Sequence, residues 1–331
     1  MQIVVGVYSP NPEDATSLYR GWGPYGHLAR RGLIRVVWLR PEDFNRWNIF
    51  QEISVVVFQR PTSAASFRMI EMVKNYGCRV VVDYDDDYFN IPDHNKTYLE
   101  YKSADAKCSI IQCISSADIV TVSTQAISES INSSGLYNVV VIPNAIEPHW
   151  FGPLSIQPKV NDFSWRGLDS HAEDLREYKS VFLSLGKQYP NSVFDFFGYF
   201  PFFIARDLKN TCRTYKGPLF NYFTELSKSD SKVGLVPLED TKFNRAKSNI
   251  AALELIMSGH VVVATNLPEF KDLPIITCTK EGFSASVEKA FSNYNKLQLE
   301  AYNYVTTFLT LDVVNQKRIE IIRELASKGR I

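Results

Sequence analysis

Short runs of apolar, β-branched residues alternate with helix-length segments along most of this 331-residue chain, and that alternation restricts its fold strongly. Runs such as Arg79–Tyr84 (RVVVDY) and His260–Thr265 (HVVVAT) are almost continuously apolar, which is typical of strands in a parallel sheet covered on both faces. Helix-length segments follow such runs, for example Ala64–Tyr76, which Gly77 closes. The alternation stops at Pro148–Pro158 and then restarts. We therefore predict an α/β protein with two Rossmann-like domains.

The predicted domain boundaries follow that interruption. Residues 1–150 form the first domain, residues 151–310 the second, and residues 311–331 a C-terminal helix. Lys and Arg together number 36, as do Asp and Glu, so net charge favours neither nucleic acid nor a membrane as a partner. The five cysteines form no C-x-x-C pair, and Met1 leads directly into an apolar run. We expect reduced thiols, no leader, no membrane insertion and a cytoplasmic location.

The stretch Phe243–Thr265 (FNRAKSNIAALELIMSGHVVVAT) combines a polar loop, a helix and a buried strand. Ser248 can cap a helix over Asn249–Met257, and Lys247 stands just before it. A helix amino end beside an ammonium group is an anion site, most simply for phosphate. Glu254 lies further along the helix, where a carboxylate can accept hydrogen bonds from ribose hydroxyls. The stretch therefore predicts a nucleotide diphosphate site, and a solvated amphipathic helix is the alternative.

Two segments of the first domain are candidates for binding a second substrate. The loop Ser9–Gly26 carries side chains that could line a cleft, or could simply wedge the loop in place: Arg20, Trp22 and Tyr25. Asp83–Asp87 places four carboxylates at the end of a strand. Such a cluster requires solvent, hydrogen bonds or a cation. The structural alternative is that these carboxylates cap helix N–H groups or accept hydrogen bonds from Tyr84 or Tyr88.

Four local sequences resemble nucleotide-sugar glycosyltransferases of the GT-B fold, in a group 1, family 4-like branch. They are VVVDYDDDYF (Val80–Phe89), VVVIPNAIE (Val139–Glu147), WRGLDSHAEDL (Trp165–Leu175) and GLVPLEDTKFNRAKSNIAALELIMSGHVVVAT (Gly234–Thr265). The last is similar to the family's donor-binding element and is the most specific. The resemblance spans most of the chain. It implies two domains facing across a cleft, with C-terminal helices packing back toward the first domain.

The resemblance also implies the co-substrate, a nucleoside-diphosphate sugar, most simply a UDP-sugar, with no cofactor or metal required. Lys247 and Ser248 would neutralise the donor diphosphate, and Glu254 would bind the ribose. Four further donor-binding candidates are Asn244, Arg245, His171 and Gly167. Ala246 stands where many retaining members have a glutamate, so the identity of the sugar stays open. The resemblance favours retention of configuration.

Sugar transfer leaves negative charge on the departing diphosphate, which cations and helix N–H groups can stabilise. The first domain should orient the acceptor hydroxyl, and the candidates for this catalytic role are Asp85, Asp86 and His27. The sequence Asp83–Asn95 (DYDDDYFNIPDHN) also resembles bacteriophage glycosyltransferases, some of which modify hydroxymethylated pyrimidines in DNA. The acceptor itself stays open, and the two candidates that we consider are a hydroxymethylated pyrimidine in phage DNA and a bacterial glycan.

Three alternatives remain at the level of sequence. Ala246 motivates a non-catalytic nucleotide- or sugar-binding protein on the same fold. The aspartates of Asp83–Asp87 suggest a haloacid-dehalogenase-type phosphatase with an aspartyl nucleophile. The D-x-D pair within the same segment also suggests the metal site of the other major glycosyltransferase fold.

Overall fold

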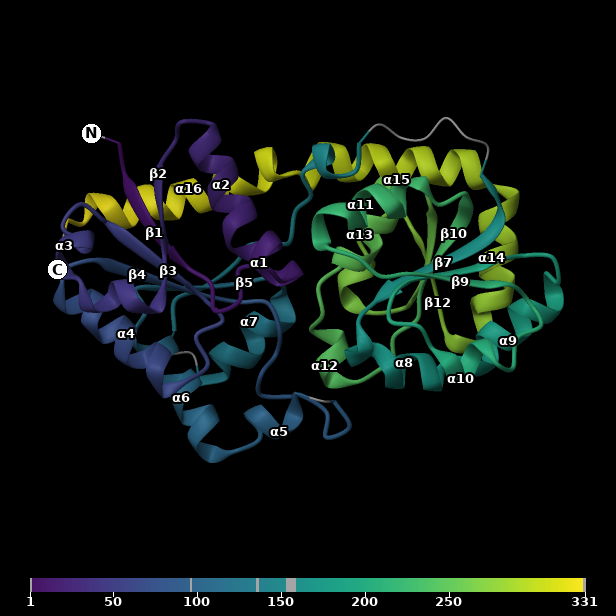
Figure 1. The fold of residues 1–331 in the computed structure, drawn as a ribbon, viewed down its shortest axis with the longest axis horizontal. Helices are drawn as coiled ribbons and strands as arrows, with labels where there is room; N and C mark the ends of the chain where they lie inside the picture. The colour runs from purple at the N-terminus through teal and green to yellow at the C-terminus, as the bar shows by residue number, and fades with distance from the viewer. Residues whose placement is uncertain (1, 96, 135–136, 153–158, 330–331) are drawn as a thin grey trace. The chain divides into compact units, whose positions relative to one another are not determined.

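The computed structural model describes residues 2–95, 97–134, 137–152 and 159–329. By its contacts the chain divides into two units. Unit 1 comprises Met1–Ala145, Ala246–Ser248 and Leu311–Ile331, and unit 2 comprises Ile146–Arg245 and Asn249–Thr310. The first break falls after Ala145 rather than at the predicted 150. Residues 153–158, within the stretch where the alternation stops, lie outside the described residues. Each unit is built on a six-stranded parallel sheet with helices on both faces, as predicted (Figure 1).

The sheet of unit 1 has the order β2-β1-β3-β4-β5-β6. Its strands are β1 (Val4–Tyr8), β2 (Arg35–Leu39), β3 (Val55–Gln59), β4 (Arg79–Tyr84), β5 (Ile119–Val122) and β6 (Val139–Val141). Its helices are α1 (Ala15–Arg20), α2 (Trp22–Arg30), α3 (Trp47–Phe50), α4 (Ala64–Asn75), α5 (Tyr98–Tyr101), α6 (Ala104–Ser116), α7 (Gln125–Ile131) and α16 (Leu311–Ser327). Every residue of β1, β3 and β5 is buried, which explains why their sequences are apolar apart from Gln59 and Thr121.

Side-chain caps start four of the unit 1 helices, α1, α4, α6 and α7. Ser63 accepts from the backbone of Ser66 at the start of α4, and Ser103 caps α6 in the same way. Asp14 caps α1, accepting from the backbone N–H of Ser17. The prediction of an irregular loop over Ser9–Gly26 is therefore wrong, because this cap starts one helix there and α2 follows directly.

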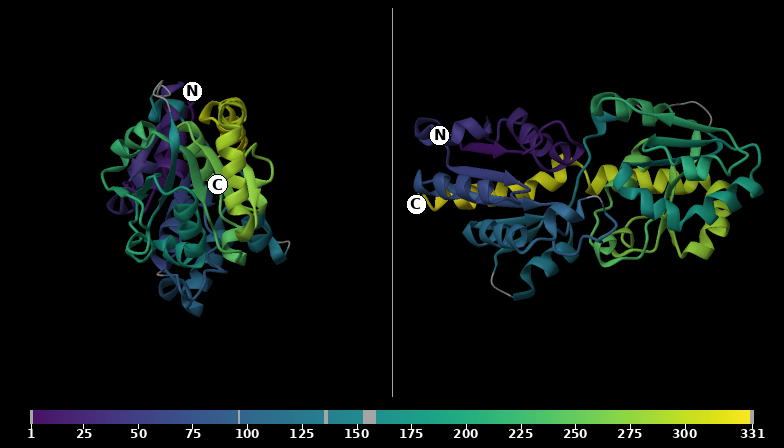
Figure 2. Two further views of the ribbon diagram at one scale, coloured as in Figure 1. Left: turned by 90° about the vertical axis from the view of Figure 1, so that its right-hand side faces the viewer. Right: turned by 60° about the horizontal axis from the view of Figure 1, so that its bottom comes forward.

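The last helix, α16, belongs to unit 1. It contacts α2 and β3, and in Figure 2 it again lies, in yellow, beside the purple and blue elements of that unit. Asn315 Nδ2 donates to the Pro24 carbonyl at 3.0 Å, which fastens α16 to α2. Of the C-terminal helices expected to pack on the first domain, α16 does so, whereas α14 and α15 stay with unit 2.

The sheet of unit 2 has the order β12-β11-β10-β7-β8-β9. Its strands are β7 (Val160–Gly167), β8 (Phe194–Gly198), β9 (Cys212–Tyr215), β10 (Ser231–Val236), β11 (Val261–Thr265) and β12 (Ile276–Cys278). Its helices are α8 (Ala172–Glu177), α9 (Lys179–Gln188), α10 (Phe202–Ala205), α11 (Leu219–Lys228), α12 (Lys242–Arg245), α13 (Ile250–Met257), α14 (Phe283–Ser292) and α15 (Tyr294–Phe308). Helices α9 and α14 cover one face of the sheet, and α11 and α13 cover the other (Figure 1).

Unit 2 departs from a simple strand–helix alternation in two places. Between β7 and β8 there are two helices, α8 and α9, which meet at Tyr178. The polar loop predicted before α13 contains a short helix, α12, because Phe243 and Asn244 are buried. Within the described ranges, no helix has the length and apolar character needed to span a bilayer.

Candidate functional site

At the carboxyl edge of unit 1, Asp83 and Arg20 form a buried ion pair. Arg20 Nε and Nη2 donate to the two carboxylate oxygens of Asp83 at 2.9 and 2.7 Å, and Thr121 Oγ1 adds a bond of 2.6 Å. Arg20 Nη1 donates to the Ile142 carbonyl at 2.6 Å. The pair therefore ties the ends of β4 and β5 to the chain after β6. Because Arg20 has only 1% exposure, its acceptor-binding prediction gives way to a structural role.

Asp87 is likewise a structural carboxylate. It is buried and accepts from Asn90 Nδ2 at 2.6 Å and from Ser130 Oγ at 3.0 Å. Tyr84 OH donates to the Pro61 carbonyl rather than to any of the aspartates. The structural interpretation of the aspartate cluster thus fits Asp83 and Asp87, with different partners from those expected.

Asp85 is the unusual member of the cluster. Its Oδ1 is buried and has no hydrogen-bond partner among the described residues. Burial raises the pKa of Asp85 to about 7, helped by the negative charge of Asp86 and opposed by the guanidinium of Arg60. A carboxyl group with a pKa near neutral can exchange a proton with a substrate hydroxyl at physiological pH.

The segment Ala246–Ser248 is grouped with unit 1. Lys247 Nζ lies 3.8 Å from Asp86 Oδ1, and Asn144 Nδ2 donates to Ser248 Oγ at 2.8 Å. The predicted helix cap at Ser248 is wrong, because α13 begins at Ile250 with Asn249 as its N-cap and no side-chain capping bond. Ser248 instead holds its segment to the chain after β6.

The candidates on α2 are largely buried. His27 Nδ1 lies 3.2 Å from Asn315 Nδ2, and its Nε2 lies 3.3 Å from Asp312 Oδ1. Burial raises the pKa of Tyr25 to about 12. Trp22 is half-buried at the helix start. These contacts give His27 a packing role against α16.

In unit 2, Glu254 lies fully buried at the centre of a hydrogen-bonded network. Arg166 Nη2 donates to its Oε1 at 2.8 Å, Arg166 Nε lies 2.5 Å from its Oε2, and Tyr222 OH donates to Oε2 at 2.6 Å. Arg166 comes from β7 and Tyr222 from α11. Sequence reasoning missed both partners, which stand 88 and 32 residues from Glu254, although Arg166 belongs to the WRG motif.

A second group in unit 2 forms around Asp174. Asp174 Oδ2 lies 2.8 Å from His171 Nδ1, and its Oδ1 accepts from Asn244 Nδ2 at 2.7 Å and from the Glu239 backbone at 2.9 Å. A carboxylate only accepts, so the hydrogen of a neutral His171 ring is on Nδ1 and Nε2 is the acceptor nitrogen. Asp174 thus orients two predicted donor residues, and the signal for it was the H-x-x-D spacing.

Gly167 ends β7 where the backbone is crowded. A Cβ at Gly167 would lie 2.7 Å from the Trp165 ring and 3.2 Å from His171 Cδ2. The adjacent Gly198 has a φ of +103°, and a Cβ there would lie 2.4 Å from the Gly167 carbonyl oxygen. Only glycine fits at these two strand ends.

Arg245 is paired at the surface. Its Nε and Nη2 donate to the carboxylate of Asp240 at 2.5 and 2.7 Å. The predicted donor residues therefore do not form one cluster. The Glu254 network and the Asp174 group lie in unit 2, whereas residues 246–248 are grouped with unit 1.

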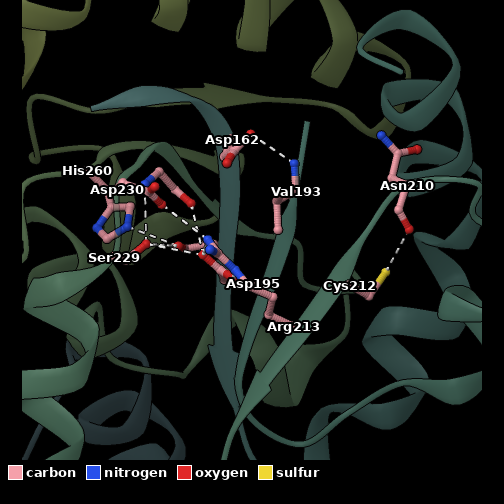
Figure 3. Close-up of polar contacts among 11 residues, drawn as sticks. Asp162, Val193, Asp195, Asn210, Cys212, Arg213, Ser229, Asp230 and His260 are labelled. Carbon is pink, nitrogen blue, oxygen red and sulfur yellow. Dashed lines mark hydrogen bonds and ion pairs between the residues drawn. The ribbon is translucent and has the colours of Figure 1, made fainter. Parts of the chain in front are cut away.

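A further polar cluster lies nearer the amino ends of the strands. Arg213 donates to Asp195 at 2.6 and 2.8 Å and to Asp230 at 3.1 Å, and Ser229 and His260 lie close by (Figure 3). A hollow of about 310 Å³ adjoins it. Ligands of α/β sheets bind at the carboxyl ends of the strands, so we assign this cluster to stability. Across the described residues, no three or more His, Cys, Asp or Glu side chains gather in a way that could hold a metal ion.

No protein-family model and no curated protein matches this sequence. Solved structures do match. A glycosyltransferase from Rickettsia africae has a TM-score of 0.65 at 13% identity, covering 99% of this chain and 100% of that one. Anabaena Alr3699/HepE, solved with UDP, has a TM-score of 0.60 at 10% identity, covering 98% and 100%. TarM of S. aureus has a TM-score of 0.62 at 13% identity, covering 81% of this chain and 54% of TarM.

The chain thus spans about half the length of TarM and the whole length of the other two. At such identities the similarity concerns the fold. The chain has the two-domain GT-B fold that the sequence resemblance implied.

Proposed function

We propose that this protein is a glycosyltransferase that uses a nucleoside-diphosphate sugar, most simply a UDP-sugar. Unit 2 would bind the donor and unit 1 the acceptor hydroxyl. The observation that carries the proposal is the position of the Glu254 carboxylate in a chain of GT-B fold. Glu254 lies on α13, and hydrogen bonds from Arg166 and Tyr222 hold its side chain in place. UDP in the similar Anabaena structure supports the choice of nucleotide.

The Glu254 network sets a condition on donor binding. Glu254 has 0% exposure, so a ribose reaches its carboxylate only if Arg166 turns aside. Donor binding should therefore break the 2.8 Å bond between Arg166 Nη2 and Glu254 Oε1. The released guanidinium then becomes available to the diphosphate, whose charge increases as the sugar departs. We place His171, Asn244, Arg245, Gly167, Lys247 and Ser248 in the same donor-binding role.

For the acceptor we propose Asp85 as the residue that accepts the hydroxyl's hydrogen bond, with Asp86 beside it. The acceptor oxygen bonds to the anomeric carbon, and the bond from that carbon to the phosphate oxygen breaks with its electron pair on the diphosphate. The hydroxyl proton leaves through Asp85 or the departing diphosphate. In line with the resemblance we propose retention of configuration, which proton NMR of the product measures directly.

A glycan hydroxyl suits unit 1 better than a hydroxymethylated pyrimidine in DNA. A DNA acceptor requires a basic groove that neutralises phosphates. Most arginines near α2 and β2 are already paired with acids: Arg31 with Asp312, Arg35 with Glu52, Arg40 with Glu42, and the buried Arg20 with Asp83. Transfer to oligosaccharides without any transfer to hydroxymethylated duplex DNA would support the glycan acceptor.

Calorimetric titration with UDP, GDP and ADP, followed by assays of UDP release from UDP-glucose and UDP-N-acetylglucosamine, tests the proposal. Glu254→Gln should weaken UDP binding at least tenfold by removing the ribose acceptor charge. Glu225→Gln is the matched control, because Glu225 forms an ion pair with Lys228 at the surface and not with the Glu254 network. A wild-type protein that binds none of the three nucleotides contradicts the proposal.

A second candidate is a nucleotide- or sugar-binding protein without turnover. Ala246, which stands where many retaining enzymes have a glutamate, is buried and carries no polar side chain. Tight UDP binding without release of sugar from either donor would favour it. The phosphatase and D-x-D alternatives are not proposed, because Arg20 and Thr121 occupy both oxygens of Asp83.

A further inference from the structure

The ends of β3 and β4 are fastened together at the carboxyl edge of the unit 1 sheet. The Arg60 backbone N–H donates to the Asp83 carbonyl at 2.8 Å. One residue further along from Arg60 and from Asp83, Tyr84 OH donates to the Pro61 carbonyl at 2.8 Å. These bonds place Gln59 and Arg60 beside the Asp83–Asp85 turn, on the edge where parallel sheets bind ligands.

The backbone at this junction is strained. Arg60 has a φ of 49°, in the left-handed region, although it carries a side chain. It also precedes Pro61, and a following proline favours extended backbone. Its guanidinium is held by an ion pair with Asp14. Conformations of this kind persist where the surrounding structure enforces them, and they cluster at ligand sites.

Two buried polar atoms at the same junction lack partners. The Gln59 amide bonds Ser17 Oγ through Oε1 at 2.9 Å, while its Nε2 has no partner among the described residues. Asp85 Oδ1 is in the same condition. Unmet buried donors and acceptors are unfavourable, so two of them beside a strained residue indicate that a ligand completes the site.

We propose that Gln59, Arg60 and Asp85 form the corner that orients the acceptor hydroxyl, an inference that rests on the glycosyltransferase function proposed above. A hydroxyl donates one hydrogen bond and accepts others, so it can satisfy the Gln59 amide and the Asp85 carboxylate together. Arg60 acts as a positioning residue.

Arg60 acts through its charge as well as its backbone. Four charged groups influence Asp85: Asp86 and Asp83 oppose its ionisation, whereas Arg60 and Arg20 favour it. Arg20 is committed to Asp83. Arg60 is therefore the cation whose removal should change the ionisation of Asp85 while leaving the Arg20–Asp83 pair intact.

The first test is Gln59→Leu, which replaces the side chain that carries the unmet amide with an apolar side chain of similar size. UDP release from UDP-glucose is measured with water and with glycerol as hydroxyl acceptors, alongside UDP affinity and the unfolding midpoint. We expect kcat to fall at least tenfold, UDP affinity to stay within twofold, and the midpoint to hold or rise. The matched control is Gln298→Leu on α15, because Gln298 Nε2 is also buried without a partner. That control should keep wild-type kcat.

The second test compares Arg60→Gln with Arg60→Lys. Arg60→Gln removes a cation that lowers the pKa of Asp85, and the opposing charges of Asp83 and Asp86 remain. The pKa of Asp85 should therefore rise, and the acid limb of the kcat profile should move to higher pH. Lysine keeps the charge and should keep the limb near its wild-type position. This readout does not depend on Gln59→Leu folding, and a purely structural role for Arg60 would not move it.

The possible failures are distinguishable. Suppose that the wild-type protein turns over the donor. The proposed corner is then overturned if Gln59→Leu is as active as wild type, or if Arg60→Gln leaves the acid limb of the kcat profile unmoved. In either case a buried water is the partner of the unmet atoms. A wild-type protein that binds no UDP, or binds it without turnover, overturns the proposed transferase function itself, and the corner with it.

Discussion

At the scale of single residues, Glu254 is both a proposed ligand group and a buried charge that depends on its partners. Arg166→Met leaves the Glu254 carboxylate buried without its counterion, so we expect a loss of about 3–5 kcal/mol in the free energy of unfolding. The double variant Arg166→Met/Glu254→Leu removes both charges and should recover most of that loss. Urea unfolding of the single and double variants measures both.

A loss below about 1 kcal/mol for Arg166→Met alone would show that the pair behaves like a surface ion pair. UDP titration of the double variant provides the functional half of the cycle. It should bind UDP poorly despite its recovered stability, which separates the binding role of the network from its structural role.

His260 makes a different contribution at the same scale. Burial lowers the pKa of His260 to about 3, and its Nδ1 and Nε2 lie 3.1 Å from the Leu255 carbonyl and 3.0 Å from Ser164 Oγ. The folded pKa lies below the unfolded value of about 6.5, so the unfolded chain binds an extra proton between these values. Stability from the neutral ring is fully present above pH 6.5 and falls as pH decreases toward 3, by about 1.4 kcal/mol per unit.

His260→Gln removes this titration. The variant should be less stable than wild type at pH 7, and the gap between them should shrink by about 3 kcal/mol on going to pH 4. Unfolding midpoints measured at each pH report the gap. A gap that stays constant between pH 7 and pH 4 would contradict this account of His260.

At the scale of elements, the close approach of the paired β7 and β8 ends affects the position of His171, because Gly167 lies directly beside the His171 ring. Gly198→Ala adds a Cβ 2.4 Å from the Gly167 carbonyl oxygen at a φ of +103°. The strand ends must separate, so we expect UDP affinity to fall at least tenfold and the midpoint to drop by several degrees. Gly32→Ala is the control, since Gly32 has a φ of +71° with nothing within 4 Å of an added Cβ.

If Gly198→Ala and Gly32→Ala lose the same stability and both keep UDP affinity, backbone strain alone explains the effect. The close approach of β7 and β8 would then have no role in the donor site. A selective loss of UDP affinity in Gly198→Ala ties that approach to function.

The elements also show what sequence can reveal. Strand β4 (Arg79–Tyr84) was predicted with its observed bounds, because a strand buried on both faces is apolar over most of its length. Helix α1 was missed, because a six-residue helix gives too short a periodic signal for its Asp14 cap to be noticed. The Arg20–Asp83 pair joins residues 63 apart, and no local pattern announces such a partner.

The candidate site was predictable for the same reason only in part. Lys247 and Glu254 stand out because a local motif surrounds them. The partners of these two side chains could not be predicted, because they depend on which distant elements the topology brings next to them. Arg166 and Tyr222 reach Glu254 from β7 and α11, and the unmet atoms of Gln59 and Asp85 exist only once β3 and β4 are paired.

At the scale of the whole molecule, the chain passes between the two units more than once. Unit 1 receives Ala246–Ser248 and α16 after unit 2 has begun, so neither unit is a single continuous segment. The proposed donor groups are divided accordingly, with Glu254 in unit 2 and Lys247 grouped with unit 1. A ligand of Glu254 should therefore change the dynamics of unit 2, and a ligand of Lys247 those of the segment grouped with unit 1.

Hydrogen exchange with and without UDP distinguishes these cases on the intact chain. We expect UDP to slow exchange in the peptides that contain α13 and the end of β7, because ligand binding lowers the population of locally open states. If Lys247 and Ser248 hold the diphosphate, the peptide spanning 246–248 slows as well. The ends of β3 and β4 should exchange unchanged, since they belong to the acceptor corner. Protection confined to unit 1, with α13 unaffected, would contradict the assignment of the donor to unit 2 and remove Glu254 from the site.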